Sequence, residues 1–380
     1  MPATASSGVP PSEDTVPEDT DPGNTDTGNT GTGKTRAGGT DSVAAGPRRV
    51  GGPSFLARLL LVALALAGTV VLSLAVGSRT LPPAEVWEAL VHGGDGTTAQ
   101  VIREMRLPRT LVGLLAGAAL GVAGAVLQGL TRNPIAEPGI LGLAQGASAA
   151  VVIAISFFGV HTLLGWIWFA FAGAGVAAVL VYAIASRGRG GASPVKLALA
   201  GAAINALLAS LIAGVLTTRS ATLDQFRFWQ IGSLTGRDAE VLGRLWPFLV
   251  IGLILALAGS RGLDALALGE DVARGLGRNV AAVRICGGLG AAVLTGTAVA
   301  AAGPIAFVGL AVPHLARALA GPSHRRLLPL AALLGPVVLL VADVVGRVVL
   351  PPSEVPAGVM TALIGVPFLI ALVRRSGVGA

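Results

Sequence analysis

Two groups of residues in this 380-residue sequence have types and spacings that could carry chemistry. The segment from Gly28 to Thr35, GNTGTGKT, matches the GxxxxGK[ST] pattern of a loop that cradles nucleotide phosphates. The other group is Asp343 with Arg347, an acid and a base spaced to pair on one helix face. Cys286 stands alone, and the histidines (His92, His161, His314 and His324) do not cluster as metal ligands. The sequence therefore predicts no metal centre.

The phosphate-loop pattern lacks the elements that would make it work. Such a loop needs a buried strand before it and a helix after it, which hold backbone N–H groups around the phosphates. Here the flanks are DTDPGNTDT and RAGGTDSV, which resemble neither element. Residues 1–50 contain few large apolar side chains, and this composition predicts a disordered tail. We therefore interpret the match as a coincidence, and we expect this chain itself to bind no cofactor.

The composition of the remaining chain indicates a membrane protein. Mean hydropathy is +0.76, and only 12% of residues are charged, against about 25% in soluble domains. The formal charge of +7 comes from scattered residues flanking apolar segments, which gives no reason to expect a nucleic-acid partner. We predict a disordered cytoplasmic tail over 1–50 and a transmembrane domain over 51–380.

The apolar segments predict an all-α polytopic fold with ten transmembrane helices. The helix at 110–130 carries Gly113, Gly117 and Gly121 on one face, a pattern that favours close helix packing. No Asp, Glu, Lys or Arg occurs from Ile285 to Ala316, and this uncharged stretch is too long for one crossing, so Gly303-Pro304 is expected to break it. The predicted spans are 55–76, 110–130, 139–158, 162–185, 195–217, 244–260, 280–301, 304–319, 327–347 and 356–373.

The distribution of Lys and Arg predicts the orientation of the bundle. With both termini inside, sixteen basic residues flank the inner ends of the spans, Arg48 and Arg49 at the end of the tail among them, and nine flank the outer ends. Because cytoplasmic loops are enriched in Lys and Arg, both termini are expected in the cytoplasm. The protein is thus expected to be a multi-pass protein of the cytoplasmic membrane.

The spans lack the several buried acids or histidines of a proton relay, so the sequence favours an energy source on another subunit. Residues 261–284 are polar and glycine-rich, and they could form two short helices whose apolar face contacts a partner, or a solvated loop. The in-span polar residues Gln128, Gln145 and Asn205 could line a path, although hydrogen bonds between helices explain them better.

Four blocks of the sequence resemble one known family. They are RLPRTLVGLLAGAALGVAGAVLQGLTRNPIAEPGILG (106–142), GEDVARGLG (269–277), GPIAFVGLAVPHLAR (303–317) and ADVVGRVVLPPSEVPAGVMTALIGVPFLIALV (342–373). The residues of these blocks, and their order along the chain, resemble those of the membrane permease subunit of ABC importers for iron–siderophore complexes and vitamin B12. The resemblance covers about residues 55–380, and it implies the ten-helix architecture of type II importers.

The resemblance also implies three sets of functional residues. The extracytoplasmic Arg106, Arg109 and Arg347 would receive acidic residues of a substrate-binding protein. A cytoplasmic gate would include Asn133, Ile135, Ala192 and Ser193, although alanine is a departure from the polar residue often found at position 192. The residues that would contact the ATPase are Gly269, Glu270, Ala273, Leu276 and Gly277.

These residues imply partners rather than an enzyme. The expected assembly contains cytoplasmic ATPase subunits that hold ATP and Mg, an extracytoplasmic binding protein, and a second permease subunit, identical or related. The expected cargo is an iron(III)–siderophore complex. Cobalamin or haem import, and from other classes a proton-coupled transporter or a membrane enzyme, stay open as alternatives.

Overall fold

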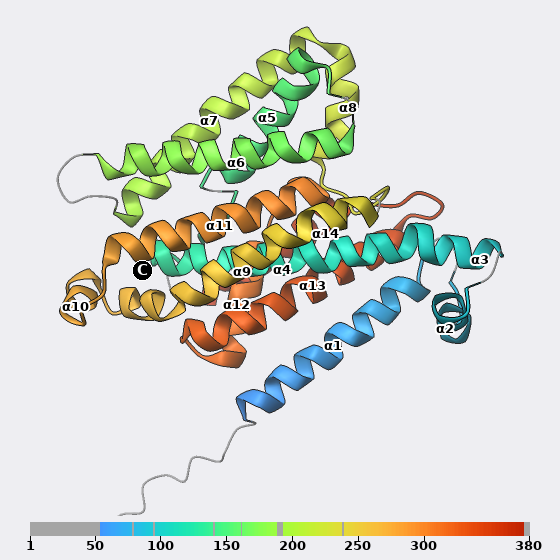
Figure 1. The fold of residues 1–380 in the computed structure, drawn as a ribbon, viewed down its shortest axis with the longest axis horizontal. Helices are drawn as coiled ribbons and strands as arrows, with labels where there is room; N and C mark the ends of the chain where they lie inside the picture. The colour runs from blue at the N-terminus through green and yellow to red at the C-terminus, as the bar shows by residue number, and fades with distance from the viewer. Residues whose placement is uncertain are drawn as a thin grey trace, which may run out of the picture. The chain divides into compact units, whose positions relative to one another are not determined.

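A computed structural model describes residues 54–77, 80–93, 96–139, 141–160, 162–187, 193–237 and 239–375. The tail over 1–50 with its phosphate-loop pattern, together with Arg79, His161 and Ala192, lies outside the described residues. Every regular element within the described ranges is a helix, as Figure 1 shows. The predicted all-α class is therefore confirmed.

The described chain forms fourteen α-helices and one short π-helix, η1. In chain order they are α1 (Phe55–Ala75), α2 (Pro83–Val91), α3 (Thr97–Gln100), η1 (Val101–Arg106), α4 (Leu107–Thr131), α5 (Leu143–Phe158), α6 (Leu163–Ser186), α7 (Pro194–Thr218), α8 (Ser220–Gln230), α9 (Ala239–Ala267), α10 (Glu270–Gly275), α11 (Val280–Ala302), α12 (Val308–Ala320), α13 (His324–Val349) and α14 (Ala357–Arg375).

Each of the ten predicted spans overlaps one of these helices. Seven segments of the described chain are long and apolar enough to cross a membrane, namely α1, α4 with its N-terminal extension, α6, α7, α9, α11 and α13. The apolar helices α5, α12 and α14 are shorter, below the ~20 residues that a perpendicular crossing needs. The chain is thus a multi-pass membrane protein, whereas the total of ten crossings stays a prediction.

Helix α4 is buried along most of its length because its glycines let other helices approach. It packs against α13, α11, α9 and α12. A Cβ atom at Gly117 would lie 2.5 Å from the backbone nitrogen of Pro336, and one at Gly121 would lie 2.6 Å from the carbonyl oxygen of Ala331. Such contacts are shorter than a side chain tolerates, so the close approach of α4 and α13 requires glycine. The predicted packing role of this glycine face is confirmed.

The predicted break between two helices lies at Gly303-Pro304. Helix α11 ends at Ala302, Gly303 adopts φ 77°, and α12 begins at Val308. A Cβ atom at Gly303 would lie 2.4 Å from the carbonyl oxygen of Trp229, so both the backbone conformation and the space require glycine. The two apolar segments therefore fold as separate helices.

The segment after α9 differs from the two short helices expected for 261–284. Helix α9 continues to Ala267, so Leu266 is a buried residue of a long helix. Between α9 and α11, where every residue is described, the only further helix is α10, six residues long. The expectation of two helices was wrong because 261–267 carries a helical pattern continuous with α9, and Gly269 (φ 109°) supplies the first break.

Candidate functional site

Two of the three arginines predicted to contact a binding protein hold the same carboxylate inside the chain. Arg109 on α4 donates from Nη2 to Asp343 Oδ1 at 2.8 Å and from Nε to Asp343 Oδ2 at 3.0 Å. Arg347 donates to Asp343 Oδ2 from Nε at 3.0 Å and also from Nη2. Asp343 is fully buried, and both arginines are nearly so. Two guanidinium groups therefore neutralise one buried acid, an arrangement that offsets its desolvation.

Arg347 and the third arginine, Arg106, bind the end of α1. Arg347 Nη1 donates to the carbonyl oxygens of Ser73 (2.7 Å) and Val76 (3.0 Å). Arg106 Nη1 donates to those of Leu74 (2.7 Å) and Ala75 (2.8 Å). The last carbonyls of a helix lack partners within the helix, and a positive charge there is favourable. The arginines thus fix where α1 ends against α4 and α13.

We call Arg106, Arg109, Arg347, Asp343 and Glu354 the arginine cluster. Glu354 completes it, since its Oε2 accepts from Arg109 Nη1 at 2.6 Å while its side chain keeps 30% of its surface exposed. Three positive and two negative charges leave an excess of one positive charge. The Asp343–Arg347 pair predicted from sequence is confirmed. The roles of Arg109 toward Asp343 and of Glu354 were missed, because those partners lie 234 and 245 residues from Arg109.

A second group of charges surrounds Glu270, the first residue of α10. Its Oε1 pairs with Arg284 and lies 3.9 Å from Arg132 Nη2, and its Oε2 lies 3.3 Å from Arg274 Nη2. We call these four residues the Glu270 cluster. Arg109 lies in the first turn of α4 and Arg132 follows its last residue, so the two clusters lie 23 residues apart along this helix, a distance of about 35 Å at 1.5 Å per residue.

The predicted ATPase-contact residues divide into buried and exposed positions. Ala273, on the inner face of α10, is fully buried, whereas Leu276, which follows α10, is 61% exposed. Leu268 and Val272 are exposed apolar neighbours of this segment. Gly269 and Gly277 adopt positive φ, at 109° and 73°, before and after the short helix. The structure therefore presents α10 as a short helix, held by the Glu270 cluster, on which exposed apolar side chains stand beside the exposed charges of Asp271 and Arg274.

A group of hydrogen bonds, which we call the clasp, joins Asp264 of α9 to Ser323 and His324 at the start of α13. Asp264 Oδ1 accepts from the backbone nitrogen of His324 at 2.6 Å and contacts His324 Nδ1 at 2.8 Å. Ser323 Oγ donates to Asp264 Oδ2 at 3.0 Å. The carboxylate thus caps the N-terminus of α13, where unpaired N–H groups favour an acid. Sequence reasoning missed this clasp, because nothing local links the two helices.

The predicted gate residues lie at the ends of helices. Asn133 Oδ1 accepts from the backbone nitrogen of Ile135 at 3.0 Å and forms a turn after α4, where Ile135 is 43% exposed. Ser193 caps α7 by accepting from the backbone nitrogen of Lys196 at 3.3 Å. Ala192 lies outside the described residues. A gate can be built from such positions, and the turn and the helix cap by themselves already account for the polar side chains of Asn133 and Ser193.

The polar residues inside the spans have two kinds of surroundings. Gln128 Oε1 accepts from Arg317 Nη1 at 2.6 Å, which is the predicted hydrogen bond between helices. Asn205 Nδ2 donates to the carbonyl oxygen of Gly139 at 2.8 Å. Asn205 also lines a pocket of about 500 Å³ with Gln145, Ser148 and Gln230. This pocket offers neutral hydrogen-bonding groups, which suits a path for a polar cargo.

Beside this pocket, the loop after α4 carries a carboxylate that the sequence did not single out. Glu137 Oε2 accepts from the backbone nitrogen of Phe307 at 3.2 Å, just before α12 begins. Burial raises the pKa of Glu137 above its ordinary value, and the hydrogen bond from Phe307 offsets part of that effect. Glu137 therefore joins the loop after α4 to the start of α12 through a contact that depends on protonation.

Comparison with known proteins identifies a family. The FecCD transport family matches residues 63–375. The ferric enterobactin transport system permease protein FepD of Escherichia coli K12 is 46% identical over 318 residues, which cover 83% of this chain and 93% of that protein. The iron(3+)-hydroxamate import system permease protein FhuB of Bacillus subtilis is 42% identical over 305 residues, covering 80% of this chain and 79% of that protein.

A solved structure has the same fold. It is described as an inward-facing conformation of a metal-chelate type ABC transporter, and it superimposes with a TM-score of 0.74 at 32% sequence identity. The match covers 83% of this chain and 98% of that one. Both the sequence and the fold therefore point to the same class of protein.

Proposed function

Because this chain belongs to the FecCD transport family, we propose that it is the permease subunit of an ATP-driven importer for an iron(III)–siderophore complex. The observation that carries this proposal is 46% identity, over most of both chains, to a permease named for ferric enterobactin transport. Other relatives are named for hydroxamate and citrate complexes of iron, so iron chelates are the shared cargo class of the named relatives. The chain would supply the path across the cytoplasmic membrane and perform no catalysis itself.

The energy would come from cytoplasmic ATPase subunits, which hold ATP and Mg. We place their contact at Gly269, Glu270, Ala273, Leu276 and Gly277. The exposed apolar side chains of Val272 and Leu276 support this assignment, since exposed apolar residues on a short helix suit a groove on a partner. The ion pairs of Glu270 would transmit movement of α10 to α4 and α11, because Arg132 and Arg284 belong to those segments.

The opposite end would receive the extracytoplasmic binding protein at Arg106, Arg109 and Arg347. The excess positive charge of the arginine cluster supports this role, because it attracts an acidic partner. Arg109 already holds Asp343 and Glu354. A carboxylate of the binding protein would therefore compete with the partly exposed Glu354, while the buried Asp343 stays in place.

The gate would lie at Asn133, Ile135, Ala192 and Ser193, between this chain and a second permease subunit, identical or related. The neutral pocket of Gln145, Ser148, Asn205 and Gln230 supports a path along the faces of α5 and α7 that line this pocket. A path without fixed charge would let a bulky chelate pass without binding it too tightly to release.

The proposal is tested by purification and transport. The tagged full-length chain, extracted from its own membrane, is expected to co-purify an ATPase subunit. The purified assembly in liposomes should accumulate a radiolabelled iron(III)–catecholate complex only with ATP and binding protein. Accumulation of cobalamin or haem instead would change the cargo, and uptake driven by a pH gradient without ATP would overturn the proposal.

The contact with the ATPase has its own variants. Leu276→Glu should lower co-purification by about tenfold, the effect of losing roughly 1.4 kcal/mol at an interface. Ser353→Glu is the matched control, since it adds the same charge at an exposed position beside the arginine cluster, at the other end of the bundle. Equal co-purification of both variants would place the ATPase contact elsewhere.

A further inference from the structure

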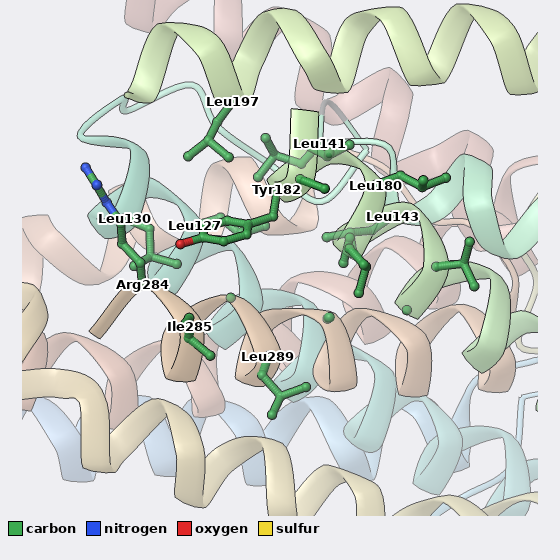
Figure 2. Close-up of a pocket in the computed structure, with 18 of the residues that line it drawn as sticks. Leu127, Leu130, Leu141, Leu143, Leu180, Tyr182, Leu197, Arg284, Ile285 and Leu289 are labelled. Atoms are coloured by element: carbon green, nitrogen blue, oxygen red, sulfur yellow. The ribbon is translucent and has the colours of Figure 1, made fainter. Parts of the chain in front are cut away.

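A cavity of about 740 Å³ lies between the helices on the side of α6 and α11, apart from the polar pocket. Figure 2 shows its walls, with Leu180 from α6, Leu289 from α11, and Leu127 and Leu143 from α4 and α5. Its lining consists of aliphatic residues and two glycines except for Thr131, Tyr182 and Arg284. A polar chelate bound here would leave its oxygens without partners. The cavity thus suits a hydrocarbon chain, and its volume lies within the ~300–1,000 Å³ of small-molecule sites.

One end of this cavity is positively charged. Arg284 lines the cavity, and Figure 2 places it beside Leu130 at the edge of the aliphatic walls. Its Nε atom is buried without a hydrogen-bond partner in the described structure. Arg284 shares Glu270 with Arg132 and Arg274, and Asp271 is the other acid among these pairs. Three positive charges and two negative ones give this group a net charge of +1, which favours binding of an additional anion.

A long apolar cavity with a cationic end matches one kind of membrane component. Basic pockets between transmembrane helices at the cytoplasmic side bind anionic lipid head groups. Both α6 and α11 are long and apolar enough to cross the membrane, so a cavity between them is at the depth of acyl chains. We propose that this cavity binds one acyl chain of an anionic phospholipid whose phosphate lies at Arg132 and Arg284.

The site would lie next to the segment that contacts the ATPase. A phosphate at Arg132 and Arg284 competes with Glu270 for the same guanidinium groups, because Glu270 Oε1 is their shared acceptor. The lipid would therefore change the restraints on α10 without touching α10 itself. Lipid binding as such does not depend on the identity of the cargo or on the ATPase.

The acyl-chain part of the site is tested by filling the cavity. Gly288 on α11 and Gly175 on α6 both line it, and a Cβ atom at either would meet no atom within 4 Å. Gly288→Leu and Gly175→Leu therefore occupy the cavity without a clash at Cβ. Gly259→Leu on α9 is the matched control, because Gly259 is equally open and does not line the cavity.

The measurement is native mass spectrometry of the purified full-length chain with phosphatidylglycerol or phosphatidylcholine of identical acyl chains. Wild type and Gly259→Leu should retain phosphatidylglycerol about tenfold better than phosphatidylcholine, whereas both filled variants should lose it. Arg284→Gln and Arg132→Gln should remove the preference for phosphatidylglycerol.

Several results would overturn the proposal. They are equal retention of the two lipids by wild type, unchanged retention in both filled variants, and displacement by free palmitate at equal concentration. If neither filled variant folds, wild type is photolabelled with phosphatidylglycerol carrying a diazirine on its acyl chain. Labels on α6 and α11 support the site, and labels confined to other helices contradict it.

Discussion

At the scale of single residues, the arginine cluster shows how one buried acid is stabilised by two bases. Asp343 has no exposed surface, and its oxygens accept from both Arg109 and Arg347. An unpaired charge in such a place is costly, whereas a paired one contributes little net stability. The two arginines are therefore needed to keep Asp343 paired inside the bundle, and with Arg106 they also give the cluster its excess positive charge.

Removing the shared acid should destabilise the protein strongly. Asp343→Ala leaves Arg109 and Arg347 without their common partner, and losing one member of a buried pair costs about 3–5 kcal/mol. Thermal unfolding in detergent measures the loss. Glu240→Ala is the control, because Glu240 pairs with Arg244 on the exposed surface, where a pair contributes about 0–1 kcal/mol. Equal melting temperatures for the two variants would contradict the role assigned to Asp343.

Glu137 should make stability depend on pH. Because its folded pKa is raised, the folded state binds the proton more tightly than the unfolded state. The stabilisation is then complete below the ordinary carboxyl pKa of about 4.3 and is lost as pH rises through the raised folded pKa. Melting temperatures of wild type should fall over this window relative to Glu137→Gln. Identical pH profiles for the two proteins would refute the assignment.

At the scale of elements, α4 organises the bundle because it tolerates contact on all sides. Its glycines bring the backbone of α13 within a distance that excludes any side chain. Its first turn carries Arg109 and its last residue precedes Arg132, so one helix joins the arginine cluster to the Glu270 cluster. Movement of α4 relative to α13 would therefore affect both ends of the molecule.

A single methyl group on α4 should disturb its packing. Gly117→Ala places a Cβ atom 2.5 Å from the backbone of Pro336, and overpacking of this kind costs about 1–3 kcal/mol. The matched control is Gly214→Ala on α7, where no atom lies within 4 Å and alanine favours the helix. Thermal unfolding should show a lower melting temperature for Gly117→Ala alone. A melting temperature as high as that of the control would contradict the packing described.

At the scale of the whole molecule, the two charged clusters give the bundle a direction. The predicted orientation puts the Glu270 cluster in the cytoplasm and the arginine cluster outside. Both positions follow from the excess of Lys and Arg on one set of helix flanks. The proposed mechanism needs this orientation, because ATP is available only on the cytoplasmic side.

The orientation is testable with single cysteines. The chain has one natural cysteine, Cys286, so Cys286→Ala provides a background for new ones. In intact cells, Ser353→Cys should react with a membrane-impermeant maleimide, and Asp271→Cys should react only after the membrane is opened. Both positions are exposed, so differences in labelling report the side of the membrane. The reverse pattern would invert the predicted topology.

The sequence by itself determined features that depend on neighbouring residues. Hydropathy predicted the apolar helices but not the short α2, α3 and α8. Gly303-Pro304 predicted the break after α11, and the spacing of Asp343 and Arg347 predicted their pair. The resemblance of four blocks also predicted the family to which the chain belongs. The exception at this scale was 261–284, where a continuous helical pattern carried α9 further than expected.

Only the tertiary structure decided which distant residues meet. It joined Arg109 to Asp343 and Glu354, placed Arg132 and Arg284 on Glu270, and formed the aliphatic cavity between α6 and α11. The physical reason is that periodicity reports on residues within a few turns of one helix. Contacts between helices depend instead on how side chains and glycines on separate segments fit together.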